Sequence, residues 1–264
     1  MNRDDIQGSS DDPVEASSRA SLHLIGGGAT TLADAALYAP FVAEAALRAR
    51  RPRPRIAVIS LHPEAEEKAA ALGELLAGAA TGPIDLHLST GTPGEPIGLD
   101  AIADVDGIAV GGGVVEDVRA GLEPVFGELR RLVAAGVPYL GVSAGAMIAA
   151  EGSLGGGSRI GGVVVSPEDP DEPGDELEIA AGIGLLDVAI EVHVAQRGML
   201  SRLVAATEAG LIPGGLGIDE RTVLIVSEGS LRVEGAGSVW RVLRTDGGVL
   251  VSTIGDARAG HPAR

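Results

Sequence analysis

Ser143 lies at the centre of the pentapeptide Gly141-Val142-Ser143-Ala144-Gly145. An apolar run, Val137 to Val142, precedes this serine and predicts a buried strand, and the small-residue run Ala144 to Ala150 predicts a closely packed helix. This G-x-S-x-G pattern between a strand and a helix is typical of a nucleophile elbow, in which a sharp turn exposes the serine Oγ. The spacing therefore predicts a nucleophilic serine. With 40 glycines in the chain, the main alternative is a small-residue turn without chemistry.

A serine nucleophile needs a general base, and the chain has 5 histidines. His23 and His87 lie inside predicted strands, where a packed histidine is the simpler reading, and His261 lies in a polar tail. His62 follows a strand, but no pattern pairs it with Ser143. His193 ends the apolar run 189–192 downstream of the serine, which is the order of hydrolases of the elbow type. We therefore expect His193 to be the base.

The carboxylate that would orient the histidine is not decided by the pattern alone. One group of candidates lies in the loop between the serine and the histidine, and a second pair leads into a later strand. The first group comprises Glu168, Asp169, Asp171 and Asp175, and the second comprises Asp219 and Glu220. Each of them could equally be a solvated loop carboxylate.

Backbone N–H groups near the elbow are candidates for an oxyanion hole. The N–H of Ala144 is the expected first donor, and the glycine run 111–113 follows the strand before the elbow strand, so that Gly112 or Gly113 could supply the second. Another glycine run, 26–28, follows the first strand. It lacks the third glycine of G-x-G-x-x-G and an acidic residue at a second strand end, so close backbone packing is favoured over binding of NAD.

The elements that must position these residues alternate between short apolar strands and amphipathic helices. Strands are predicted at 21–25, 55–60, 84–89, 107–110, 138–142, 163–166 and 189–194, and helices at 32–50, 63–79, 114–135, 144–150 and 199–209. This alternation predicts an α/β fold, a mostly parallel sheet with helices on both faces. Beyond residue 217, four short strands separated by glycine-containing turns predict a C-terminal β meander.

We expect one α/β domain over residues 21–255, between a disordered tail at 1–20 and a flexible tail at 256–264.

Composition excludes several classes of function. The formal charge of −17 and the lack of basic segments with stacking aromatics argue against nucleic acid as a partner. The absence of cysteine removes disulfides, thiolate catalysis and cysteine metal sites. No leader-like apolar segment and no run of about 18 apolar residues occurs, so we expect no membrane contact and a cytoplasmic protein.

Several motifs in order resemble those of one family, the serine peptidases that include cyanophycinase and dipeptidase E. The matching segments are 24–28, 111–113, 141–146, 182–186, 191–193, 196–198 and 216–222. The resemblance is closer to cyanophycinase, and it implies a fold similar to that of the class I glutamine amidotransferases. It implies Ser143 as nucleophile and His193 as base, and no metal or cofactor. Glu168 or Asp169 fits the family's spacing for the acid, with Glu220 as competitor.

The resemblance also implies that Glu191, Arg197 and Arg202 contact substrate, and it suggests a homodimer. The chain departs from cyanophycinase where that family has Gly-Gly-Asp-Gln, Asp-Gln-His and a further arginine; here these positions hold 111–114, 191–193 and Met199. Polar groups that would read a β-aspartyl-arginine unit are therefore partly replaced.

The sequence thus predicts a cyanophycinase-like serine hydrolase that cleaves a peptide or isopeptide bond. Two alternatives stay open. An ordinary α/β-hydrolase esterase would place its histidine near the C-terminus, where only His261 is available. A non-catalytic binding or regulatory protein of the amidotransferase-like fold would keep Ser143 as a vestige.

Overall fold

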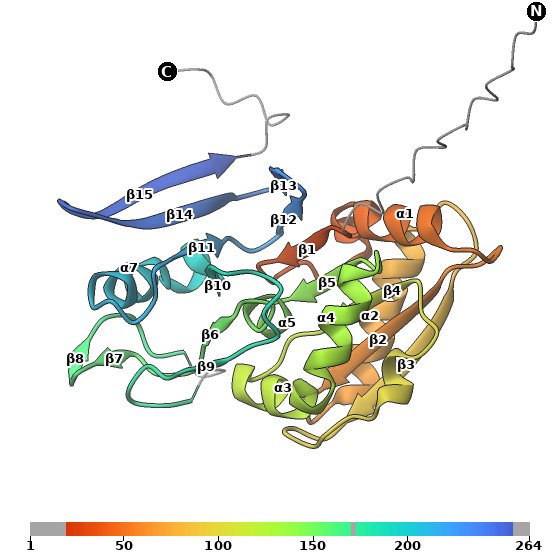
Figure 1. The fold of residues 1–264 in the computed structure, drawn as a ribbon, viewed down its shortest axis with the longest axis horizontal. Coiled ribbons are helices and arrows are strands. Elements are labelled where there is room, and N and C mark those ends of the chain that lie inside the picture. Colours follow the sequence, from red (N-terminus) through yellow and green to blue (C-terminus); the bar gives the residue numbers. More distant parts are fainter. Residues whose placement is uncertain (1–19, 170–172, 256–264) are drawn as a thin grey trace, which may run out of the picture.

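The computed structural model describes residues 20–169 and 173–255. Its largest element is a sheet of 7 strands in the order β13-β12-β1-β5-β4-β2-β3 (Figure 1). The strands are β1 (Leu22–Ile25), β2 (Arg55–Leu61), β3 (Asp85–Gly91), β4 (Gly107–Val110), β5 (Tyr139–Val142), β12 (Thr222–Ser227) and β13 (Ser230–Gly235). The strands β1, β5, β4, β2 and β3 are parallel to one another. The strand β12 is antiparallel to β1, and β13 is antiparallel to β12.

Both faces of this sheet are covered by helices, because its central strands are apolar on both sides. In β2, Ala57 and Ile59 face one core with α3 (Val115–Leu122) and α4 (Phe126–Ala134). Their neighbours Ile56 and Val58 face a second core with α1 (Ala39–Arg48) and α2 (Ala65–Ala79). The predicted α/β class, a mostly parallel sheet between helices, is confirmed.

A second sheet has the order β10-β11-β14-β15 and lies on the side of the molecule opposite β3 (Figure 1). Its strands are β10 (Ala189–Val192), β11 (Gly214–Ile218), β14 (Ser238–Thr245) and β15 (Gly248–Gly255). The helix α7 (Leu200–Glu208) packs on it through Leu203 and Ala206, which belong to the same core as β2 and α4. One apolar core therefore runs from the main sheet to the second sheet.

The remaining elements are short. They are the 3-10 helices η1 (Leu32–Leu37), η2 (Leu99–Ile102) and η3 (Glu123–Val125), the helices α5 (Ala144–Met147) and α6 (Val194–Arg197), and the two-stranded ribbons β6 (Gly152–Leu154) with β9 (Ile179–Ala181) and β7 (Arg159–Ile160) with β8 (Val163–Val164).

Several predicted elements differ from the structure. The helix expected at 32–50 is divided into η1 and α1, and the helix expected at 114–135 into α3, η3 and α4; Pro40 and Pro124 stand in the first turns of α1 and η3. The C-terminal strands are antiparallel as expected, but they do not form one meander. The pair β12 and β13 extends the main sheet, whereas β14 and β15 extend the second sheet.

The tails expected at 1–20 and 256–264 fall, apart from Ala20, outside the described residues. In the part of the chain that is described, no helix is both long enough and apolar enough to cross a membrane.

The strand ends determine where chemistry can occur. In the main sheet the parallel strands β1 and β5 lie side by side, with Ile25 opposite Val142, so the loop at Gly26 and the elbow at Ser143 leave the sheet together. In the second sheet Val192 is opposite Ile218, so His193 and Asp219 also leave together. Backbone hydrogen bonds from His193 N to Gly26 O and from Arg221 N to Gly27 O join the two edges. Loops at the carboxyl ends of parallel strands are where open α/β sheets place ligands.

Candidate active site

Ser143 stands in a strained turn between β5 and α5. Its φ is 53° and its ψ is −115°, a conformation that side chains other than glycine rarely adopt. The turn closes because its neighbours lack side chains: a Cβ on Gly141 would strike the carbonyl of Gly145, and a Cβ on Gly145 would strike that of Val110. The buried Tyr139 hydroxyl donates to Gly145 O at 2.7 Å. These contacts hold the Oγ at the edge of the sheet.

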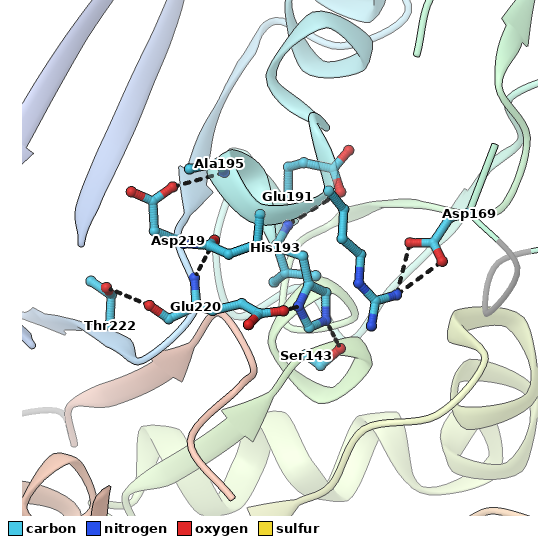
Figure 2. Close-up of polar contacts among 11 residues, drawn as sticks. Ser143, Asp169, Glu191, His193, Ala195, Asp219, Glu220 and Thr222 are labelled. Atoms are coloured by element: carbon cyan, nitrogen blue, oxygen red, sulfur yellow. Dashed lines mark hydrogen bonds and ion pairs between the residues drawn. The ribbon is translucent and has the colours of Figure 1, made fainter. Parts of the chain in front are cut away.

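His193 occupies the turn after β10, in the left-handed region with φ 52°. Its Nε2 lies 2.9 Å from the Oγ of Ser143 (Figure 2). The imidazole packs against the backbone of Gly27, where any side chain would overlap the ring. The glycine loop that follows β1 therefore makes room for the histidine, which agrees with the close packing expected for it.

Glu220 lies on the other side of the imidazole, in the turn between β11 and β12. Its Oε1 is 2.8 Å from Nδ1 of His193, and its carboxylate packs against Gly28. The backbone N–H of Glu220 donates to Gln196 Oε1 at 2.8 Å. Because Glu220 accepts from Nδ1–H, the neutral imidazole presents its Nε2 lone pair to the serine hydroxyl.

The other carboxylates considered from sequence are placed elsewhere. Asp169 accepts hydrogen bonds from Nη1 of Arg197 at both of its carboxylate oxygens, each at 2.9 Å. Glu168 is exposed and lines a separate cavity of about 420 Å³ that also borders Asp169. Asp171 lies outside the described residues. The carboxylate at His193 Nδ1 is therefore that of Glu220. The family's spacing favours Glu168 or Asp169 instead, and the structure places neither of them at this nitrogen.

The surroundings of His193 favour its neutral form. Burial lowers the pKa of the imidazole below 6.5, and the nearby Arg197 guanidinium acts in the same direction. The hydrogen bond and charge of Glu220, and the charge of Asp169, raise this pKa and partly offset the shift. A neutral imidazole is the form that can accept a proton from Ser143.

Two of the three expected oxyanion donors lie beside Ser143. Ala144 is the first residue of α5, where helix geometry leaves its N–H without a partner inside the helix. A Cβ on Gly112 would lie 3.2 Å from Ser143 Cβ, so the backbone of Gly112 approaches the serine. Gly113 packs instead toward Leu61 O and Val118.

The residues expected to contact substrate are engaged with other groups. Glu191 and Arg202 form an ion pair, with Nε to Oε2 at 2.8 Å and Nη2 to Oε1 at 2.9 Å, and their side chains are only 1% and 2% exposed. Arg202 Nη1 also donates to the carbonyls of Gly155 and Gly157. The third residue, Arg197, is one-third exposed and binds Asp169. The ion pair between Glu191 and Arg202 therefore holds the loop at Gly155 and Gly157 to β10.

Glu191→Gln is expected to lower the free energy of unfolding by about 3–5 kcal/mol, because it leaves the Arg202 guanidinium buried without a counter-charge. Urea denaturation measures this loss. The double variant Glu191→Gln with Arg202→Met should recover part of it. Glu128→Gln is the matched control, since Glu128 also binds an arginine through two short hydrogen bonds, but at the surface, and it should change stability little. A loss for Glu191→Gln as small as that of the control would contradict this account.

A cleft of about 660 Å³ opens at the Ser143 hydroxyl. Its lining includes Ser143, His193 and Glu220, the expected substrate contacts Glu191, Arg197 and Arg202, and residues of the β2 and α2 region. The latter are Leu61, His62, Pro63, Lys68, Ala71, Leu72 and Leu75. Cavities of about 300–1,000 Å³ are typical of small-molecule sites. Among residues 20–169 and 173–255, no three His, Asp or Glu side chains gather in a way that could hold a metal ion.

Comparison with known proteins identifies the family. The profile of peptidase family S51 matches residues 64–234. The chain belongs to peptidase family S51. Cyanophycinases of Synechococcus elongatus and of Thermosynechococcus vestitus are each 34% identical to it over 146 residues, which are 53% of this chain. The aligned part is 42% of those relatives, so the chain spans less than half the length of the curated proteins it matches.

Solved structures confirm the fold of this S51 chain. A peptidase from an acI-B1 actinobacterium superposes with a TM-score of 0.62 at 16% identity, over 92% of this chain and 96% of that one. A putative peptidase E protein from Listeria monocytogenes superposes with a TM-score of 0.51 at 14% identity, over 83% of this chain and all of that one. The resemblance to the cyanophycinase and dipeptidase E family, drawn from the sequence motifs, is confirmed.

Proposed function

We propose that this S51 chain is a cyanophycinase-like serine peptidase that hydrolyses a peptide or isopeptide bond in a short substrate. The observation that carries the proposal is the continuous hydrogen-bonded series from Ser143 Oγ through His193 to Glu220, with distances of 2.9 and 2.8 Å, at the wall of the cleft (Figure 2). A hydroxyl, a neutral imidazole and a carboxylate in that order are the parts of a nucleophilic triad.

The chemistry follows from the protons that this series can move. His193 Nε2 accepts the hydroxyl proton while Ser143 Oγ attacks the substrate carbonyl carbon, and Glu220 stabilises the imidazolium that forms. The N–H groups of Ala144 and Gly112 bind the oxyanion. The imidazolium then donates its proton to the leaving nitrogen, the C–N bond breaks, and an ester to Ser143 remains. Water, deprotonated by His193, hydrolyses that ester and restores the serine.

The esterase alternative loses its support, since it requires a histidine near the C-terminus. His193 already binds Ser143, and His261 lies outside the described residues. The proposal includes a peptide substrate, a cytoplasmic location, a homodimer and a single domain over residues 21–255. The first three rest chiefly on family resemblance and composition.

A mass-spectrometric cleavage profile tests the proposal. The library contains α-peptides, β-aspartyl dipeptides and arginine-containing isopeptides, and wild type is run beside Ser143→Ala. We expect products that are absent with the variant, and the bonds cleaved name the substrate class. If no product depends on Ser143, the non-catalytic alternative is favoured over the peptidase.

A further inference from the structure

Asp219 is a buried carboxylate, 5% exposed, that immediately precedes Glu220 and belongs to none of the groups that would touch substrate. Its two oxygens accept three hydrogen bonds from neutral donors in different parts of the chain. Oδ1 accepts from Ala195 N at 3.0 Å and from Trp240 Nε1 at 2.9 Å, and Oδ2 accepts from Ser238 N at 2.9 Å. Figure 2 shows the first of these, directed away from Ser143.

The three donors lie where they can fix the positions of His193 and Glu220, two members of the proposed triad. Ala195 is two residues after His193, at the start of α6, so its bond to Asp219 ties the histidine turn to the glutamate turn. Ser238 and Trp240 belong to β14, which pairs with β11. The backbone repeats the link, since Asp219 N donates to Ser238 O at 3.2 Å. Asp219 therefore joins the two turns to one strand of the second sheet.

The surrounding chain is shaped to hold this side chain. A Cβ on Gly237 would overlap Asp219, so only glycine leaves room for the carboxylate there. A buried carboxylate is costly unless its acceptor positions are filled, and here three donors fill them. A fixed carboxylate of this kind holds its neighbours in one arrangement, which is how supporting hydrogen bonds keep catalytic groups in a productive geometry.

We propose that Asp219 is a positioning residue that sets the distance between His193 and Glu220 by anchoring both of their turns to β14. The inference rests on the proposed peptidase function for its effect on turnover. Its structural part stands separately, because the hydrogen bond between His193 Nδ1 and Glu220 can be observed without a substrate.

The test is Asp219→Asn in the full chain, with two measurements. The amide keeps an oxygen that can accept from Ala195 N and Trp240 Nε1, but its NH₂ group faces the Ser238 N–H, so one of the two side-chain hydrogen bonds to β14 is replaced by a repulsive donor–donor contact. We expect kcat to fall by about 10–100-fold with little change in KM, since a misplacement of about 1 Å can cost 100-fold. We also expect the slowly exchanging, downfield imidazole proton of His193 Nδ1 to weaken in the proton NMR spectrum, and Glu220→Gln identifies that resonance.

Two further variants complete the experiment. Trp240→Phe removes a single donor and should produce a smaller change of the same kind, which keeps the proposal testable if Asp219→Asn folds poorly. Thr207→Val is the matched control, because Thr207 is fully buried and donates to Leu203 O at 2.8 Å within α7. It should leave kcat and the imidazole proton unchanged.

The two proposals fail in different ways. An imidazole proton and a kcat that are both unchanged in folded Asp219→Asn would overturn the role of Asp219. Absence of any Ser143-dependent turnover in wild type would overturn the peptidase proposal, and the NMR signal would still decide whether Asp219 holds His193 against Glu220.

Discussion

Ser143→Ala is expected to lower kcat by about 10⁵–10⁶-fold on whichever substrate the wild type cleaves, because nothing else in the series from Ser143 to Glu220 can form the acyl intermediate. The residual rate should still exceed that in water by about 10³-fold, since Ala144 and Gly112 would continue to bind the oxyanion. Fold stability should change little, because the hydroxyl lies at the cleft and its removal leaves no cavity in the core.

The measurement is kcat and KM, with Tm determined beside them. Ser153→Ala is a matched control: Ser153 lies in β6, and its buried Oγ has no hydrogen-bond partner among the described residues, so its loss should alter neither turnover nor folding substantially. A Ser143→Ala enzyme within tenfold of wild type would show that another group attacks the substrate.

The geometry explains why the serine and the histidine could be found in the sequence. Both stand directly after an apolar strand, Ser143 after β5 and His193 after β10, and a strand end is a position that hydrophobic patterning locates well. The parallel strands β2 and β4 were equally predictable, because residues 56–59 and 107–110 are continuous runs of apolar residues and glycine that are buried on both faces.

The partner of His193 was harder to choose, because contact between residues far apart in sequence is set by which strands pair, here β10 with β11. The family's spacing favours Glu168 and Asp169, in the segment before His193. In the structure Arg197 binds the Asp169 carboxylate, and the register of β10 with β11 brings Glu220, which follows His193 in the chain, to the imidazole. The sequence does carry a signal for Glu220. Asp219 and Glu220 follow an apolar run within the segment 216–222, which resembles a motif of the family.

The glycines after β1 show a second limit of sequence patterns. A run of three glycines is compatible with a nucleotide loop, and only the structure shows that Gly27 and Gly28 leave room for His193 and Glu220. The strand β11 was not predicted, because three of its five residues are glycine, which has low strand propensity. Close contacts with Leu203 and with the carbonyl of Ala189 account for the glycine at position 215.

Glu220→Gln is expected to lower kcat by about 10⁴-fold, since an amide no longer fixes the Nδ1–H tautomer or stabilises the imidazolium. The same change removes the two contributions by which Glu220 raises the pKa of His193, its hydrogen bond and its charge. The pKa of His193 should therefore fall further below 6.5. Because the neutral imidazole is the active form, the acid limb of kcat/KM should move to lower pH, and a pH–rate profile measures both effects.

Asp169→Asn tests whether the acid of the triad is Glu220 or Asp169, one of the two carboxylates that the family's spacing favours. Asp169 also raises the pKa of His193, but only through its charge, so its loss should move the acid limb slightly in the same direction. The catalytic tautomer would remain fixed by Glu220, and kcat should stay within about tenfold of wild type, because the hydrogen bond to Nδ1 is untouched. A large loss of kcat in Asp169→Asn, together with a small one in Glu220→Gln, would reverse the assignment of the acid.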